Sequence, residues 1–128
     1  FIADSRIAEV DANARSFENL ARNLADNGLD IASIPLVIQF NKRDLEDIRP
    51  ESEIDTLAAL GREPVYKAVA VRGRGVAETF VGLFSLTWNA LENQHELANR
   101  FGIPSSEIIG YVESLLSCEQ GDLLEGDG

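Results

Sequence analysis

Segments typical of strands alternate with segments typical of helices along the chain, and this alternation is the strongest constraint on its fold. Three short apolar runs have the composition of strands buried in a parallel sheet, namely residues 1–3, 36–40 and 65–71. Apolar residues recur at helical spacing in the segments between and after them, at 7–27, at 50–61 and from Val76 onward. The sequence therefore predicts an α/β fold in which parallel strands alternate with helices.

The predicted sheet has too few strands to be stable by itself. Three parallel strands leave an open edge and a bare face that need partners. Phe1-Ile2-Ala3 reads as the last part of a buried strand, and the chain contains no methionine. We therefore expect further segments upstream of Phe1 that complete the domain.

Composition limits the classes of partner. The 128 residues suffice for one domain, and 45% hydrophobic and 26% charged residues are ordinary for a globular protein. The net charge of −11 repels phosphate backbones, so nucleic acid is not an expected partner. No apolar stretch is long enough to cross a bilayer, so we expect no transmembrane segment and a cytoplasmic protein. The single cysteine, Cys118, has no partner for a disulfide or a metal site.

The most informative motif is Asn41-Lys42-Arg43-Asp44, which directly follows a predicted strand. Open α/β sheets bind ligands at the carboxyl ends of their strands. An ionised Asp44 can accept hydrogen bonds from both N1–H and the exocyclic amine of guanine, a pair that adenine lacks. The Lys42 stem can lie along the face of the base while its ammonium stays in water. Asn41 carries both a donor and an acceptor and is suited to tying neighbouring loops together.

A second segment, Val69-Ala70-Val71, ends the next predicted strand. A small residue at Ala70 lets the backbone approach the edge of a base. The Ala70 N–H can donate to guanine O6, where adenine presents an amine instead. Because the carboxyl ends of neighbouring parallel strands lie at one edge of a sheet, we expect the two segments to converge on one purine.

These residues resemble a known family. Gln39-Phe40-Asn41-Lys42-Arg43-Asp44-Leu45 is similar to the base-recognition motif of Ras-like small GTPases, and its flanks most resemble the bacterial gliding-motility and polarity GTPases, the MglA family, which are relatives of the ADP-ribosylation-factor family. Ala3-Asp4-Ser5 fits the end of an earlier strand, and Val69-Ala70-Val71 with Gly75, Val76 and Phe80 fits the last strand and helix. The resemblance covers residues 1–98 and implies the carboxyl-terminal half of a three-layer α/β/α P-loop GTPase domain.

The resemblance also implies a set of site residues and a cofactor. Guanine nucleotide, as GTP or GDP, would be bound through Asn41, Lys42, Asp44, Ala70 and Val71. Val69 and Val71 stand where Ras has Ser and Lys, so we expect backbone rather than side-chain contacts from that loop. No catalytic residue and no metal ligand is predicted in this chain.

The chain has no phosphate-binding loop of the form Gly-x-x-x-x-Gly-Lys-Ser/Thr, and it has none of the switch segments that bind Mg²⁺. We therefore expect these residues alone to be inactive, while the parent protein is a GTP hydrolase whose Mg²⁺ is held by an upstream half. By resemblance, that parent is a GTP/GDP switch in cell polarity or gliding motility, with a roadblock-domain GTPase-activating protein as its partner.

Alternative interpretations remain open. The Asn-Lys-Arg-Asp run can be a simple polar turn, because Asn and Asp favour turns. Gly73-Arg74-Gly75 superficially resembles a dinucleotide-binding fingerprint, but Glu78 stands at the third glycine position and would repel a pyrophosphate. A different class of function is a non-hydrolysing scaffold or interaction domain that keeps only the base pocket. An unrelated α/β interaction domain is a third, weaker alternative.

The end of the chain lies beyond the resemblance. Gly102-Ile103-Pro104 breaks the long helix, and residues 99–117 are predicted to add an amphipathic helix that docks on the domain or engages a partner. The remaining residues, 118–128, are acidic and glycine-rich and are predicted to be disordered.

Overall fold

The computed structural model describes the backbone of residues 1–124 and the side chains of residues 1–117. These residues form two compact units, Phe1–Gly75 and a second that begins at Val76. Each is described by itself.

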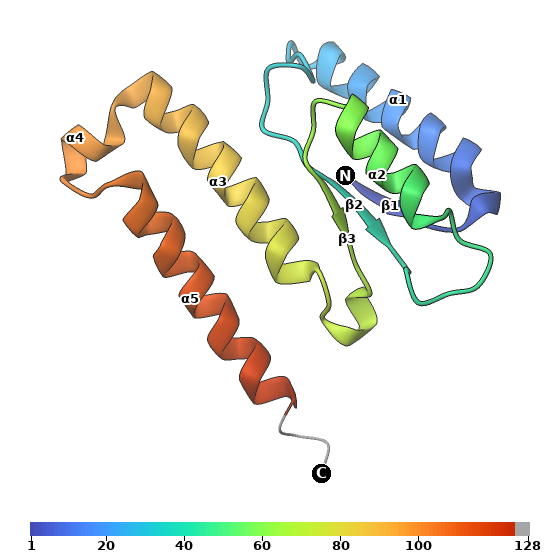
Figure 1. The fold of residues 1–128 in the computed structure, drawn as a ribbon. Coiled ribbons are helices and arrows are strands. Elements are labelled where there is room, and N and C mark those ends of the chain that lie inside the picture. The colour runs from blue at the N-terminus through green and yellow to red at the C-terminus, as the bar shows by residue number, and fades with distance from the viewer. Residues whose placement is uncertain (125–128) are drawn as a thin grey trace. The chain divides into compact units, whose positions relative to one another are not determined.

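The first unit is a parallel three-stranded sheet with helices (Figure 1). Its elements in chain order are β1 (Ile2–Asp4), the 3₁₀ turn η1 (Ile7–Glu9), α1 (Val10–Asp26), β2 (Ile38–Asn41), α2 (Glu51–Leu60), β3 (Val65–Lys67) and the 3₁₀ turn η2 (Ala70–Arg72). β2 lies between β1 and β3, and both of its pairings are parallel. This order of alternating strands and helices confirms the predicted α/β fold.

One face of the sheet carries the core of this unit. The register pairs Ala3 with Phe40, so their side chains point to the same face, where both are buried against Ile54 of α2. Phe1, on the same face as Ala3, packs edge-on against Phe17 of α1 with ring centroids 5.3 Å apart. Helices α1 and α2 therefore cover the same face of the sheet.

The third strand is shorter than the sequence predicts. We expected a strand over 65–71, but β3 ends at Lys67 and the chain turns through η2. The Val69 and Arg74 backbones exchange two hydrogen bonds, of 3.0 and 3.2 Å, which close this turn. These local bonds replace the ladder to β2, so Ala70 and Val71 lie in a turn rather than in a strand.

The second unit is helical, with α3 (Val76–His95), α4 (Leu97–Phe101) and α5 (Ser105–Leu124). Helix α5 packs against α3, which is the docking alternative for the added helix. Phe84 stacks on Phe80 and on Trp88, with centroids 6.5 and 6.2 Å apart, because residues four apart share one helix face. The Trp88 indole N–H donates to the Ser105 hydroxyl at 2.9 Å, which joins α3 to the start of α5.

Helix α5 continues beyond the predicted boundary. We expected disorder from residue 118, yet the backbone stays helical through Leu124, in a segment that contains good helix formers such as Glu119 and Gln120. Residues 125–128 of the predicted disordered tail lie outside the described residues. None of the helices in the described part of the chain is long and apolar enough to cross a membrane.

The turn after β3 requires glycine at position 75. Gly75 has φ +75°, and a Cβ there would lie 2.1 Å from the Lys67 carbonyl oxygen. Gly73 has a similar φ of +70° but nothing within 4 Å of its Cβ position. The two glycines therefore share the backbone requirement and differ in the available space.

We predict that Gly75→Ala destabilises the protein by about 3 kcal/mol, because the added methyl group clashes with the backbone and the residue also carries the strain of a left-handed conformation. Gly73→Ala, the matched control, should cost about 1 kcal/mol from backbone strain alone. Urea denaturation of both variants measures the difference. Equal losses in the two variants would contradict the close approach of Gly75 to β3.

Candidate functional site

The Asn41 side chain joins the loops that follow β2 and β3. Its Oδ1 accepts a hydrogen bond from the Ala70 N–H at 2.9 Å and another from the Lys42 N–H at 2.7 Å. A backbone hydrogen bond of 3.1 Å from the Arg43 N–H to the Ala68 carbonyl runs beside it. The loop that carries Asp44 is therefore held against the turn that carries Ala70, as we expected from the parallel strand order.

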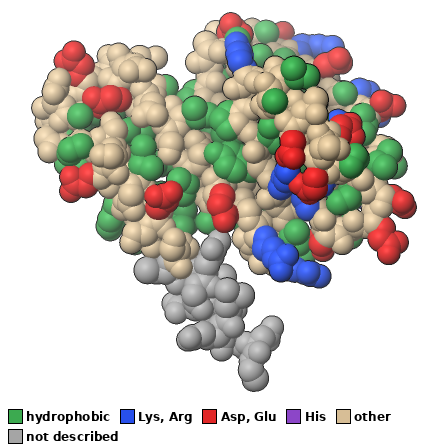
Figure 2. Space-filling view, in the orientation of Figure 1, with side chains coloured by type: hydrophobic (Ala, Val, Ile, Leu, Met, Phe, Trp, Pro, Cys, Tyr) green, Lys and Arg blue, Asp and Glu red, His purple; other side chains and the backbone are tan. Residues whose placement is uncertain are grey.

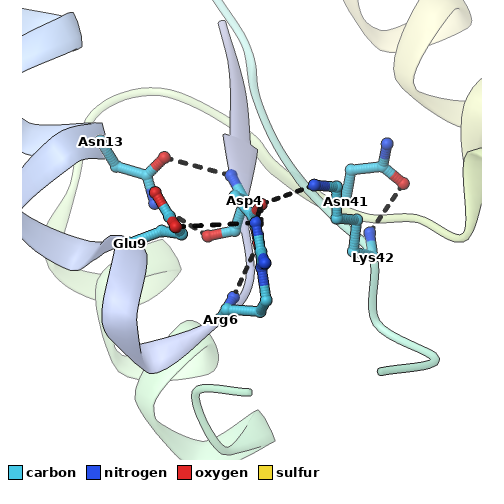
Figure 3. A network of polar contacts seen from close by, with 6 residues as sticks. All are labelled: Asp4, Arg6, Glu9, Asn13, Asn41 and Lys42. Atoms are coloured by element: carbon cyan, nitrogen blue, oxygen red, sulfur yellow. Dashed lines mark hydrogen bonds and ion pairs between the residues drawn. The ribbon is translucent and has the colours of Figure 1, made fainter. Parts of the chain in front are cut away.

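Asp4, at the carboxyl end of β1, forms an ionic cluster with Arg6 and with Lys42 of this loop (Figure 3). Arg6 donates to the Asp4 carboxylate through Nε and through a terminal nitrogen, the latter at 2.7 Å. The Lys42 ammonium donates to Asp4 Oδ2, also at 2.7 Å. Asn13 of α1 binds the Asp4 backbone, accepting from its N–H at 3.1 Å and donating to its carbonyl at 2.8 Å.

The electrostatics of Asp4 follow from these partners. The hydrogen bonds from Arg6 contribute most, with a further contribution from Lys42, and together they hold the pKa of the Asp4 carboxyl well below its ordinary value of 3.8. Glu9 adds a second acid at 3.6 Å from Arg6. The cluster thus places two cations and two carboxylates at the ends of β1 and β2.

A second ionic cluster supports the loop from the side of α2. The Arg43 side chain is only 7% exposed, donates to the Arg49 carbonyl at 2.7 Å and pairs with Glu51. Lys67 of β3 pairs with Glu51 and, at 2.6 Å, with Asp55. Hydrogen bonds from Lys67 and then Arg43 lower the pKa of Glu51, and those to Asp55 and then Glu51 raise the pKa of Lys67. These contacts tie the middle of the motif to α2.

Two contacts within the site bear on the predictions for Ala70 and Lys42, which stay predictions. We expected the Ala70 N–H to be available for guanine O6, but it donates to Asn41 in the structure. We also expected the Lys42 ammonium to stay in water, whereas it pairs with Asp4, although the Lys42 side chain remains 47% exposed. In both cases a polar group of the site has a partner within the protein.

Asp44 and Val71 remain available to a ligand. The Asp44 side chain is exposed and has no hydrogen bond or ion pair within the described part of the chain. Val71 is 88% exposed, and its N–H makes no hydrogen bond to any residue that the structure describes. The candidate site thus offers a carboxylate on the loop after β2 and a backbone N–H on the turn after β3.

Sequence reasoning missed the residues that hold this arrangement together. The sequence does not predict Asp4, Arg6 and Asn13 as part of the site, and it indicates no role for Arg43. The position of Asp4 at the end of a strand adjacent to β2 was a usable signal, since parallel strands end at one sheet edge. Nothing in the spacing of Asn13 indicated its contact with Asp4.

No metal site is evident in the part of the chain that the structure describes, where no group of three or more His, Cys, Asp or Glu side chains could hold an ion.

Figure 2 shows acidic side chains over both units, whereas the visible Lys and Arg side chains gather on the first. The ion pairs described above lie on that unit.

The fold is a partial P-loop GTPase fold, in which three parallel strands alternate with helices and the Asn-Lys-Arg-Asp loop follows β2. A comparison of the sequence with curated proteins found a relative. The chain is 41% identical over 92 residues to the Mutual gliding-motility protein MglA of Myxococcus xanthus (strain DK1622). The match covers 72% of this chain and 47% of that protein, so the chain spans about half the length of its relative.

This similarity confirms the resemblance to the Ras-like gliding-motility GTPases, to which the chain is related. No family model matches the chain.

The lowered pKa of Asp4 predicts how stability depends on pH. Because the carboxyl is more acidic in the folded than in the unfolded chain, its ion pairs stabilise the fold fully above about pH 5 and are lost as pH falls below its ordinary pKa of 3.8. We predict that Asp4→Asn lowers the urea midpoint at pH 7 and that its difference from the unaltered protein shrinks below pH 4.

The control for this titration is Glu46→Gln, which removes an exposed loop carboxylate that makes no ion pair within the described residues. It should leave the midpoint nearly unchanged at every pH. A difference between Asp4→Asn and the unaltered protein that stays constant down to pH 2 would contradict the ion-paired Asp4.

Proposed function

We propose that this chain supplies the guanine-recognition part of a GTP/GDP switch that acts in cell polarity or gliding motility. The observation that carries the proposal is the hydrogen bond from the Ala70 N–H to Asn41 Oδ1. It holds two loops together at one sheet edge, with the Asp44 carboxylate exposed on one of them. The similarity to a gliding-motility protein supports the cellular role.

Base selection would depend on Asp44 and on the turn after β3. The Asp44 carboxylate would accept hydrogen bonds from guanine N1–H and from the exocyclic amine. The Val71 N–H would donate to O6, and the Ala70 N–H would join it by sharing its hydrogen with Asn41. Adenine offers an amine where O6 stands and has no N1–H, so it would leave the carboxylate unpaired.

The remaining parts of the switch are proposed to lie outside this chain. The sequence contains no phosphate-binding loop, so contacts to the phosphates, the Mg²⁺ ion and the hydrolytic water would come from an upstream segment. By the family resemblance, the whole protein would hydrolyse GTP in the cytoplasm and would respond to a roadblock-domain activator. These properties are proposals for the whole protein.

The test is a titration of the full-length natural protein with fluorescent GDP and ADP. We predict saturable binding of GDP and at least about 100-fold weaker binding of ADP, because a charged hydrogen-bond pair is lost and a carboxylate is left unpaired. Asp44→Asn should weaken GDP binding by a similar factor and should favour xanthosine diphosphate, whose base presents an acceptor where guanine presents its exocyclic amine.

The matched control is Asp47→Asn, in the same loop. Asp47 is exposed and has a left-handed backbone (φ 54°) that Asn also adopts readily, so this variant should bind GDP normally. Equal affinity for GDP and ADP, or an Asp44→Asn variant that binds like Asp47→Asn, would refute guanine recognition at this site. Binding of GDP without any GTP hydrolysis would favour the scaffold alternative over the switch.

A further inference from the structure

We propose that Asp4 is a positioning residue that fixes the Lys42 side chain in readiness for the base. This inference rests on the proposed function and adds a residue from a different strand to the base site. It concerns β1, which lies next to β2 in the sheet but contributes nothing to the Asn-Lys-Arg-Asp loop itself.

The Lys42 residue is held at both ends. Its backbone adopts a left-handed conformation with φ 66°, which is unfavourable for a lysine, and its N–H is bound by Asn41 Oδ1 at 2.7 Å. At the other end of the side chain, Nζ is 2.7 Å from Asp4 Oδ2. The methylene stem therefore runs along a defined path between two fixed points.

Asp4 is a firm anchor because its own groups are bound. Arg6 holds the carboxylate through two nitrogens, and Asn13 holds the backbone N–H and carbonyl of the same residue. The Asp4 side chain is only 17% exposed, whereas that of Lys42 is 47% exposed. The pair thus joins a fixed carboxylate to a stem that still presents surface to solvent.

A lysine stem that is already ordered costs less to immobilise when a base lies against it. A free lysine has several rotatable bonds, and ordering them on binding reduces affinity. The ammonium contributes little directly, since it is already paired with Asp4. The benefit of Asp4 to nucleotide binding should therefore pass through Lys42 and vanish when the lysine is absent.

The experiment is a double-mutant cycle in the full-length natural protein, with Asp4→Asn, Lys42→Met and both together, and with fluorescent GDP as the probe. We expect Asp4→Asn alone to raise the Kd by about five- to tenfold. In the Lys42→Met background the same change should raise the Kd less than about twofold. Urea midpoints measured on all variants separate loss of fold from loss of affinity.

Glu9→Gln is the matched control for charge. It removes one negative charge from the same cluster, and Glu9 lies 3.6 Å from Arg6 without an ion pair to Lys42. It should leave the Kd within about twofold of the unaltered protein, which excludes a general effect of charge on an anionic ligand.

The outcomes separate this inference from the proposal beneath it. If the unaltered protein binds GDP and Asp4→Asn has the same effect with and without Lys42, or has no effect, the positioning role is overturned and guanine recognition stands. If the unaltered protein does not bind GDP, guanine recognition is overturned and the positioning role falls with it.

Discussion

The amide oxygen of Asn41 is the single acceptor on which the geometry of the site depends. It binds the first backbone N–H of its own loop and the Ala70 N–H of the turn after β3. An apolar residue at position 41 would leave both N–H groups without this partner. The backbone hydrogen bond from the Arg43 N–H to the Ala68 carbonyl would still join the two loops. Asn41 thus holds the loops after β2 and β3 together at the sheet edge where we propose that the base binds.

Ionic contacts fix the same loop from two sides. On the side of β1, Asp4 holds the Lys42 ammonium, and on the side of α2, Glu51 holds the nearly buried Arg43. The consecutive residues Lys42 and Arg43 therefore pair with different clusters, while Asp44 stays exposed and without a partner in the described region. Exposed ion pairs contribute little to stability. Here they hold the loop in place while the Asp44 carboxylate stays exposed.

Much of this arrangement could be predicted from the sequence, and the limits are physical. The apolar runs that end at Ala3 and Phe40 correctly predicted two strands, because strands of parallel sheets have nearly continuous apolar sequences, although Ile2 of β1 is 69% exposed here. The predicted third strand was too long. Val69-Ala70-Val71 has the composition of a strand, but backbone hydrogen bonds between Val69 and Arg74 close it into a turn. The Asn-Lys-Arg-Asp motif predicts the candidate site, and the end of the neighbouring strand could have indicated Asp4. Asn13 belongs to the site only through a tertiary contact that no spacing encodes.

The most direct measurement of the central claim is the ¹H–¹⁵N NMR spectrum of the full-length protein during titration with GDP and with ADP. The account predicts that GDP shifts the amide resonances of both Ala70 and Val71, in proportion to saturation, and that ADP at the same concentration leaves them in place. GDP binding that shifts neither amide would contradict it, because the base would then lie away from the turn that Asn41 holds.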